Sequence, residues 1–192
     1  MYDPIERLQT IWSQAKNNPL LQQKSAVCVS TINAEGFPDG RFVDLKEISQ
    51  AGILFCSGYD SQKGRDIARN PKVAMTAWWE PVEYQVRLFG VAEKIDSSLA
   101  DKYWQSRHQS ARIISAHMQQ SLPADSLQAI QENFKNAQAQ WQEKMVPRPA
   151  NWGGYRVIPQ QIELLRFEAS RLHYRECFTK TGSQWHYQVL QP

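Results

Sequence analysis

The chain has 192 residues, of which 42% are hydrophobic and 21% are charged. That length and composition suffice to bury the core of one folded domain and exclude global disorder. The 22 Lys and Arg residues exceed the 19 Asp and Glu residues by only three. This balance argues against a nucleic-acid-binding protein, since such proteins usually carry a dense basic stripe. We therefore expect a single domain over residues 1–192 with local anion sites and no nucleic-acid partner.

The cysteines and the apolar pattern bear on metals, membranes and compartment. Cys28, Cys56 and Cys177 are too few and too scattered for a disulfide framework or a zinc site, so we expect no metal. No apolar run approaches the ~20 residues of a membrane span, and the first residues lack the pattern of a signal peptide. The sequence therefore predicts a cytoplasmic protein with reduced thiols and no membrane partner.

The first half of the chain alternates between helical and strand patterns. Asp3 and Pro4 are typical of a helix start, and apolar residues then recur at helical spacing, which predicts a helix over residues 4–17. Residues rich in β-branched side chains follow and predict a hairpin over 25–46. The remaining expected elements are a strand over 53–56, a short helix over 61–68 capped by Ser61 or Asp60, and strands over 73–79 and 84–94.

The second half opens with a helical insert, predicted over about 97–142. Residues 151–156 contain two glycines between aromatics and are interpreted as a tight turn. Strands are then expected over 154–158, 162–167, 174–179 and 185–190. Short strands joined by tight turns favour antiparallel pairing, and a closed or nearly closed barrel hides their edges. We therefore expect a β-rich α+β fold, an antiparallel barrel with peripheral helices.

Two candidate anion sites lie before residue 70. Arg41 and Lys46 are five residues apart, so a regular strand would present them on opposite faces, where they could serve two different anions. A helix start at Ser61, with Lys63 in its first turn, can hold a phosphate through backbone N–H groups. The alternatives are two solvated charges and an ordinary helix cap.

Two further candidates lie after residue 100. Tyr103 and Arg107 are spaced i, i+4 on a predicted helix, which would bring a phenol beside a guanidinium that suits a phosphate monoester. Arg171, His173 and Arg175 alternate along a predicted strand and would project from one face, where they repel each other unless anions bind. His173 could transfer a proton or donate to a ligand oxygen. Solvated surface charges are again the alternative.

Common hydrolase, metalloprotease and nucleotide-binding motifs are absent from the sequence. In order and spacing, the candidate segments instead resemble the pyridoxine (pyridoxamine) 5′-phosphate oxidase family, over residues 3–192. The segments that carry the resemblance are Arg41 to Lys46, Ser61 to Lys63, Asn70-Pro71, Tyr84 to Val86, Lys102 to Arg107, Gln120-Ser121, Trp152 to Val157 and Ile162 to Arg175.

The resemblance implies an FMN-binding split barrel and an obligate homodimer with two flavins at the subunit interface. The family oxidises the 4′ carbon of pyridoxamine or pyridoxine 5′-phosphate to the aldehyde of pyridoxal 5′-phosphate. A hydride passes to the flavin, and O₂ reoxidises the flavin and yields peroxide. The cofactor carries this chemistry, whereas the protein orients the two rings and holds two phosphates. The expected partners are thus a second copy, FMN, O₂ and a small phosphorylated substrate.

The resemblance also implies roles for individual residues. Arg41 and Lys63, with Ser57 and Gln62 nearby, would bind the FMN phosphate. Gln85 and Arg175 would contact FMN or lie close to it, and Gln120 and Ser121 would reach it from the other subunit. The substrate's phosphate would be held by Lys46, Tyr103, Arg107 and Ser110. Arg171 and His173 would lie over the substrate ring as the catalytic pair.

The sequence departs from the family pattern at four positions. Leu165 stands where the family usually has Trp, Tyr174 where it has Asp, Asp44 where it has an apolar residue, and Ala111 where it has Ser, so that Ser110 would have to substitute. These departures bear on the substrate more than on the flavin. They keep two alternatives open, an FMN-dependent oxidase of the same fold and of the phenazine-biosynthesis type, and a non-catalytic flavin- or haem-binding split barrel.

Overall fold

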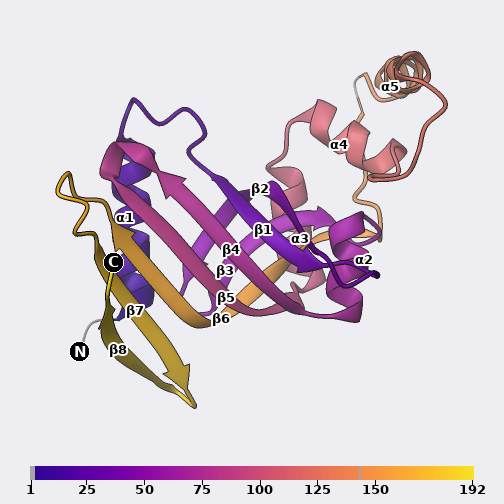
Figure 1. Ribbon diagram of the computed structural model, residues 1–192. Coiled ribbons are helices and arrows are strands. Elements are labelled where there is room, and N and C mark those ends of the chain that lie inside the picture. Colours follow the sequence, from indigo (N-terminus) through magenta and orange to yellow (C-terminus); the bar gives the residue numbers. More distant parts are fainter. Residues whose placement is uncertain (1–2, 143) are drawn as a thin grey trace.

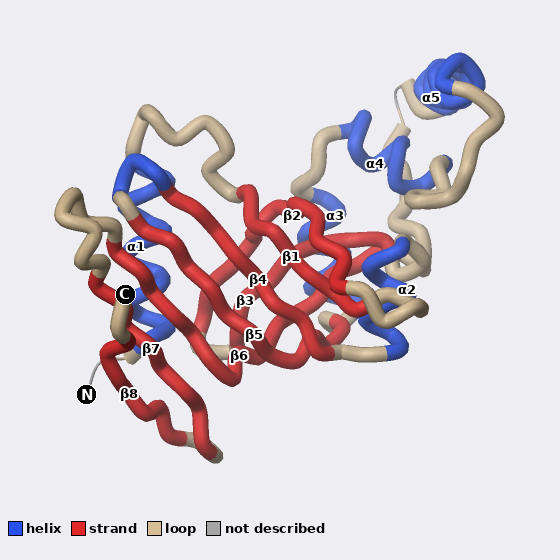
Figure 2. The backbone as a smooth tube through the Cα atoms, viewed as in Figure 1, coloured by secondary structure: helices blue, strands red, loops and turns tan. Residues whose placement is uncertain are grey.

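The computed structural model describes residues 3–142 and 144–192. Its centre is an antiparallel sheet that curls into a barrel (Figures 1 and 2). The strands are β1 (Ala26–Ile32), β2 (Pro38–Ser49), β3 (Gly52–Gly58), β4 (Lys72–Trp79), β5 (Tyr84–Lys94), β6 (Trp152–Arg166), β7 (Tyr174–Thr181) and β8 (Gln184–Leu190). The helices are α1 (Pro4–Asn17), α2 (Gln62–Arg69), α3 (Ser97–Gln105), α4 (Gln109–His117) and α5 (Leu127–Gln140), with a short 3₁₀ turn η1 (Glu80–Val82).

The strand order is β3-β2-β1-β4-β5-β6-β7-β8, and a further pairing of β3 with β6 closes the first six strands into a barrel. Closure removes the exposed edges that an open sheet would present to other chains. The β7–β8 hairpin extends the sheet beyond the barrel and lies at the opposite end of the molecule from α2 (Figure 1). The expected antiparallel barrel with peripheral helices is confirmed.

The predicted helix over residues 4–17 is confirmed as α1. Asp3 caps it by accepting a hydrogen bond from the backbone N of Ile5 at 2.8 Å. The apolar face of α1, including Leu8, Ile11 and Ala15, packs into the same buried cluster as the strand residues of the barrel. Burial of each large apolar side chain contributes about 1.5–3 kcal/mol, so α1 is held mainly by this packing and not by helix propensity alone.

A second, smaller core lies under the helices of residues 97–140. It consists of Trp104, Ile113, Ala137, Val146 and Trp152. The indoles of Trp104 and Trp152 meet edge to face with ring centroids 4.9 Å apart. Because Trp152 begins β6, this contact attaches α3 to the barrel of its own chain, whereas α4 and α5 project away from the barrel (Figure 1).

The structure corrects the expected elements over residues 151–167. Trp152–Arg166 is one 15-residue strand, not a turn followed by two strands. The register shifts where Phe89 pairs with Gln161 and Gly90 pairs with Pro159, so a bulge accommodates the proline, which has no N–H to donate. β6 is long because it pairs with β3 at its start, with β5 along its length and with β7 at its end.

No helix among the described residues combines the length and the apolar character that crossing a membrane requires.

Candidate functional site

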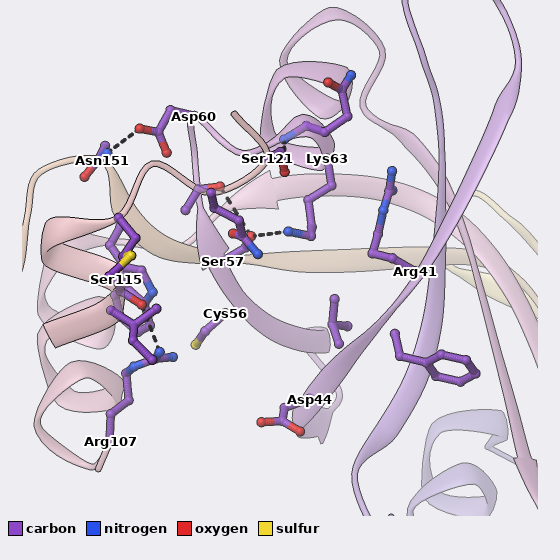
Figure 3. Close-up of a pocket in the computed structure, with 18 of the residues that line it drawn as sticks. Arg41, Asp44, Cys56, Ser57, Asp60, Lys63, Arg107, Ser115, Ser121 and Asn151 are labelled. Carbon is purple, nitrogen blue, oxygen red and sulfur yellow. Dashed lines mark hydrogen bonds between the residues drawn. The ribbon is translucent and has the colours of Figure 1, made fainter. Parts of the chain in front are cut away.

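A cavity of about 690 Å³ lies beside β2, β3, the start of α2 and the turn between α3 and α4 (Figure 3). Its volume is in the range of small-molecule and cofactor sites. In Figure 3, Lys63 and Ser57 lie above Cys56, Arg107 and Asp44. The predicted site residues that line it are Arg41, Lys46, Ser57, Gln62, Lys63, Arg107, Gln120 and Ser121.

Lys63 is the most buried cation of this cavity, with 6% of its surface exposed. Its Nζ donates to Ser57 Oγ at 3.1 Å and to Ser61 Oγ at 3.2 Å, both of which are neutral groups. Burial and, to a lesser extent, the charge of Arg41 lower the pKa of Lys63 to about 8. An anion beside these two cations would offset both effects, which makes this end of the cavity suited to a phosphate.

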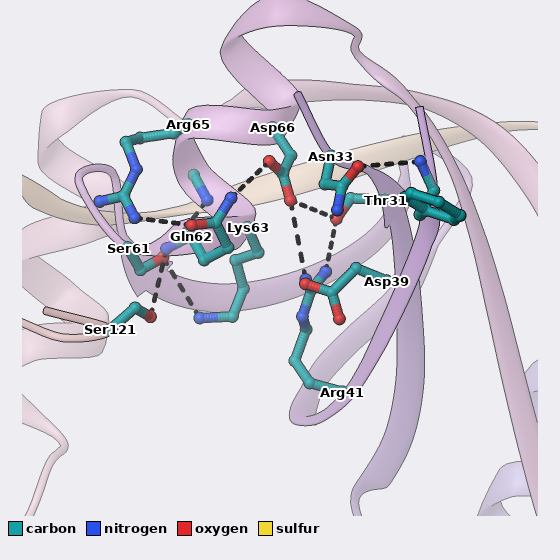
Figure 4. A network of polar contacts seen from close by, with 12 residues as sticks. Thr31, Asn33, Asp39, Arg41, Ser61, Gln62, Lys63, Arg65, Asp66 and Ser121 are labelled. Atoms are coloured by element: carbon teal, nitrogen blue, oxygen red, sulfur yellow. Dashed lines mark hydrogen bonds and ion pairs between the residues drawn. The ribbon is translucent and has the colours of Figure 1, made fainter. Parts of the chain in front are cut away.

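Arg41 is fixed beside Lys63 by an acidic network (Figure 4). Its Nη1 donates to Thr31 Oγ1 at 2.6 Å, while Nη2 pairs with Asp39 and lies 3.7 Å from Asp66 Oδ2. Asp66 is fully buried on α2 and also accepts from Gln62 Nε2 at 2.9 Å. The network therefore ties β2 to α2 and holds the guanidinium in place before any ligand arrives.

The start of α2 packs closely on the chain before it, which requires a glycine at position 64. A Cβ there would lie 2.2 Å from the carbonyl oxygen of Tyr59 and 2.8 Å from that of Gly58. We expect Gly64→Ala to lower the free energy of unfolding by about 1–3 kcal/mol, as measured by urea denaturation. Ala68→Ser, an exposed substitution on the same helix, is the control. An unchanged urea midpoint for Gly64→Ala would contradict the close packing.

Gln120 and Ser121 line the cavity of their own chain. The family resemblance implied that they reach FMN from the other subunit, and that part stays a prediction. The Oγ of Ser121 accepts a hydrogen bond from the backbone N of Gln62 at 3.2 Å, so the loop after α4 reaches the start of α2.

Arg107 marks the other end of the cavity. Its guanidinium lies 4.9 Å over the ring of Trp152 and 5.8 Å from that of Trp104. Nη2 donates to Ala111 O at 3.1 Å and to Ser115 Oγ at 3.0 Å, whereas Nε is buried and has no hydrogen-bond partner among the described residues. Burial lowers the pKa of Arg107. Because a buried, unpaired donor is costly, an anionic ligand at this end would stabilise the arrangement.

Two carboxylates of β2 engage the other groups expected at this end. The Nζ of Lys46 lies 3.4 Å from Asp44 Oδ2, and the hydroxyl of Tyr103 donates to Glu47 Oε2 at 3.2 Å. Burial, followed by the charge of Glu47, raises the pKa of Tyr103 to about 12. Lys46 lines the cavity, but Tyr103 is not among the cavity residues and directs its proton to Glu47.

Both faces of β2 contribute to the cavity. The consecutive residues Arg41 to Asp44 all line it, as does Lys46, so the two cations can share one cavity although a regular strand would present them on opposite faces. A bulge follows, where Leu45 pairs with Phe55 and Glu47 pairs with Leu54.

The predicted side-by-side placement of Tyr103 and Arg107 on one helix is wrong. α3 ends before Arg107 and α4 begins after it, so the i, i+4 spacing does not apply. Ser110 is exposed on α4 and is not among the cavity residues, whereas Ser115 contacts Arg107 and lines the cavity. No signal in the sequence pointed to Ser115, because it lies eight residues after Arg107 and beyond the helix break.

Six of the predicted site residues are not among those that line this cavity: besides Tyr103 and Ser110, they are Gln85, Arg171, His173 and Arg175. Gln85 lies on β5, where it pairs with Trp78 and Leu165. Arg175 lies on β7, and its guanidinium binds the buried carboxylate of Glu163 at 2.8 Å. Glu163 lies on the neighbouring strand β6, and its carboxylate offsets the positive charge of Arg175, for which the sequence pattern showed no partner.

Arg171 and His173 lie in the loop between β6 and β7, so the expectation that they alternate along a strand with Arg175 is wrong. Arg171 has φ of 65°, the left-handed region that no strand residue adopts. The backbone N of Glu168 donates to Nδ1 of His173 at 3.2 Å, and the imidazole packs on Phe167 with centroids 4.7 Å apart. His173 lines a separate hollow of about 580 Å³ near the C-terminus.

Comparisons with known proteins agree over nearly the whole chain. The family model described as pyridoxamine 5′-phosphate oxidase matches residues 13–141, and that of the pyridoxine 5′-phosphate oxidase C-terminal dimerisation region matches residues 152–192. The pyridoxine/pyridoxamine 5′-phosphate oxidase of Synechocystis sp. is 37% identical over 182 residues, which cover 95% of this chain and 85% of that protein. The enzyme of the same name from Alcanivorax borkumensis is 36% identical, and the alignment covers 99% of this chain and 90% of that enzyme.

Solved structures show the same fold. PhzG from Burkholderia lata, in complex with tetrahydrophenazine-1-carboxylic acid, superposes with a TM-score of 0.92 at 25% identity and covers 99% of this chain and 93% of its own. An FMN-binding protein of Nostoc punctiforme related to pyridoxamine 5′-phosphate oxidase gives 0.77 at 15% identity, with full coverage of both chains. The family matches and the identities establish that the chain belongs to the pyridoxamine 5′-phosphate oxidase family.

Proposed function

We propose that this protein is an FMN-dependent oxidase that converts pyridoxamine or pyridoxine 5′-phosphate to pyridoxal 5′-phosphate, with O₂ as electron acceptor. The observation that carries the proposal is one cavity with two separate sets of cations, Arg41 and Lys63 at one end and Lys46 and Arg107 at the other. Each end suits one phosphate monoester, and the volume between them suits two stacked rings. The names of the relatives support the same activity.

The end at Lys63 fits the phosphate of FMN. A buried ammonium whose hydrogen-bond partners within residues 3–142 and 144–192 are two serine hydroxyls, beside a fixed guanidinium, is a preformed site for a dianion. Gln62 and Ser121 extend the polar wall at the start of α2. The chemistry that bound FMN supplies is acceptance of a hydride from the substrate's C4′ and two-electron reduction of O₂ to peroxide. The chain's own contribution is to orient the two rings and to limit their access to water.

The end at Arg107 is proposed to hold the substrate's phosphate. The planar guanidinium, fixed by Ala111 O and Ser115 Oγ and stacked on Trp152, has a free Nε donor for a phosphate oxygen. Lys46 adds a second charge at the same end. Anchoring the phosphate here sets where the substrate ring and its C4′ lie, so these residues act on the reaction by positioning.

The catalytic pair is proposed to come from the partner subunit of a homodimer, with the flavin at the interface. The loop between β6 and β7, which carries Arg171 and His173, lies at the far end of the molecule from α2 (Figure 1), and neither residue lines the cavity of its own chain. Residues 152–192, which include both, match a dimerisation region. In the dimer, His173 would hold or take the proton at the substrate's 4′ substituent, and Arg171 would stabilise the substrate ring from the side opposite FMN.

Replacing Arg107 by glutamine tests the substrate end alone. Loss of a charge-assisted contact to phosphate is expected to raise KM for pyridoxine 5′-phosphate by about 30- to 100-fold with little change in kcat. The Kd of FMN should stay the same, because Lys63 and Arg41 are intact. Lys102→Gln, an exposed charge change on α3, is the matched control in the same steady-state assay. Equal KM values for the Arg107 variant and the wild type would contradict this role.

The activity itself is tested on the FMN-loaded protein. Aerobic incubation with pyridoxine 5′-phosphate should release pyridoxal 5′-phosphate and peroxide in equal amounts. Unphosphorylated pyridoxine should be a far poorer substrate, because it lacks the group that Arg107 binds. A yellow, FMN-loaded protein that turns over neither pyridoxine nor pyridoxamine 5′-phosphate would refute the proposal.

A second candidate is an oxidase of the same fold that acts on a ring carboxylate. The structural similarity to PhzG in complex with a tetrahydrophenazine carboxylic acid and the pairing of Lys46 with Asp44 favour it. A single carboxylate needs less positive charge than a phosphate dianion. Parallel assays with pyridoxine 5′-phosphate and a reduced phenazine carboxylate distinguish the two, and the higher kcat/KM identifies the substrate class.

A further inference from the structure

An acidic residue lies inside the cation cluster at the substrate end. Asp44 lines the same cavity as Lys46, Cys56 and Arg107, and Figure 3 shows it on the side of the cavity where Arg107 lies. Its Oδ2 is 3.4 Å from Nζ of Lys46, and its Oδ1 accepts from Ser25 Oγ at 3.1 Å. The carboxylate therefore already occupies one of the two cations that the proposed function gives to the substrate's phosphate.

The charge of Asp44 reaches the other groups of this end as well. Burial lowers the pKa of Arg107, and the charge of Asp44 acts against that effect. Burial also raises the pKa of the Cys56 thiol to about 11, with Lys46 and Arg107 lowering it and Asp44 raising it. Four side chains from β2, β3 and the α3–α4 turn thus share one electrostatic environment, in which Asp44 is the negative member.

Glu47 adds to this pattern from the same strand. Its carboxylate accepts a hydrogen bond from the Tyr103 hydroxyl and pairs with Arg156 Nη1 at 2.9 Å. Since Tyr103 donates to Glu47, its oxygen presents only lone pairs to a ligand, and a phosphate dianion has no proton to offer them. Tyr103 is therefore no donor to a phosphate here, and among the described residues at this end the charged donors are Arg107 and Lys46, so the ion pair between Lys46 and Asp44 affects one of two cations.

We propose that Asp44 determines the charge selectivity of the substrate's anion site. It holds Lys46 in the free protein and repels a dianion, so a phosphate binds here only by displacing the contact between Lys46 and Asp44. The inference rests on the proposed function, because it takes the anion at this end to be the substrate's phosphate. Its consequence is a weaker phosphate site than the same cavity would form with an uncharged residue at position 44.

A purely structural role for Asp44 does not account for its position. Its side chain is 65% exposed, and its ion pair is an exposed contact of the kind that contributes little to stability. The isosteric variant Asp44→Asn keeps the size of the side chain and can still accept from Ser25, so it should fold normally and report on charge alone.

The test is calorimetric titration of inorganic phosphate into the FMN-loaded protein at low salt and pH 7.5. FMN occupies the Lys63 end, so the titration reports the Arg107 end, and inorganic phosphate is not turned over. Asp44→Asn is expected to lower the Kd of phosphate by about three- to tenfold. Glu132→Gln, which removes one exposed charge on α5 far from the cavity residues, is the control and should leave the Kd unchanged.

A double-mutant cycle with Lys46 identifies the mechanism. If Asp44 acts by competing for Lys46, most of the effect of Asp44→Asn should disappear in a Lys46→Met background. An equal Kd in wild type and Asp44→Asn, or no phosphate binding by either, would overturn the inference. Turnover of pyridoxine 5′-phosphate is measured separately. If the wild type turns over the substrate but Asp44→Asn leaves the Kd of phosphate unchanged, the inference is refuted and the proposed function stands. If Asp44→Asn lowers the Kd of phosphate but there is no turnover, the inference stands and the proposed function is refuted.

Discussion

Replacing Lys63 by glutamine is expected to weaken FMN binding by about 100-fold, or about 2–3 kcal/mol, which is the contribution of charge-assisted hydrogen bonds to a phosphate. The ammonium is buried, and in the part of the chain that the structure describes it donates to Ser57 and Ser61 alone. Glutamine retains a donor for the two hydroxyls but brings no charge to the ligand. Equilibrium titration with FMN, followed by flavin fluorescence, measures the change.

The same variant separates binding from folding. An ammonium that is buried without a carboxylate opposes folding, since its folded-state pKa of about 8 lies below its ordinary value of 10.5. The FMN-free wild type should therefore gain stability as the pH rises from about 8 to 10.5, where the unfolded chain binds more protons. Lys63→Gln should lack this gain and be no less stable than the wild type to urea at pH 7. A variant that unfolds more readily would point to a structural role.

The affinity for FMN should also depend on pH in a defined direction. A bound phosphate dianion raises the pKa of Lys63 above its value in the free protein. Binding therefore takes up a proton once the free ammonium is titrated, and the affinity should decline as the pH rises above about 8. Lys63→Gln should show no such decline. Lys72→Gln, an exposed substitution at the start of β4, is the charge control and should behave as the wild type.

Local signals in the sequence were sufficient for most elements of the fold. Asp3 before Pro4 and the spacing of Leu8, Ile11 and Ala15 determine α1 within one turn, because capping and amphipathic packing act over neighbouring residues. Ser61 likewise caps α2. The long strand β6 was not predictable in the same way. Pro159 by itself predicts the end of a strand, because proline has no N–H to donate. Only the bulge opposite Gly90 in the folded sheet shows that the strand continues.

The sequence was sufficient to predict several residues of the candidate site but not how they are arranged. The cations at positions 41, 63 and 107 meet in one cavity, as charge chemistry and the family resemblance indicated. The spacing of residues along the chain could not predict which side chains contact the candidate site residues in the folded protein. Glu47 captures the Tyr103 hydroxyl from another element, and Glu163 neutralises Arg175 from the adjacent strand. The left-handed Arg171 ends the apparent alternation before β7 begins. In the first two cases a residue distant in the sequence overrides a local pattern, and in the third the backbone itself departs from the strand.

A heterodimer of two inactive variants is expected to recover about half of the wild-type activity if each site combines the cavity of one subunit with the loop of the other. Lys63→Gln disables the cavity, and His173→Ala disables the loop between β6 and β7. In the mixed dimer, both defects meet in one site, while the second site combines an intact cavity with an intact loop. Each homodimer carries one defect in both of its sites and should be nearly inactive at limiting FMN.

Coexpression of the two variants with different affinity tags, followed by tandem purification, yields the heterodimer. It should hold one FMN per dimer and turn over pyridoxine 5′-phosphate with the KM of the wild type, because its active site contains no substitution. If Arg171 and His173 instead served the cavity of their own chain, each site of the heterodimer would keep one defect, and activity would stay at the level of the parent variants. The flavin content makes this outcome informative, since one bound FMN with no recovered turnover would show that an intact cavity had formed without the partner's loop. The result therefore decides whether the loop between β6 and β7 completes the site of the opposite subunit.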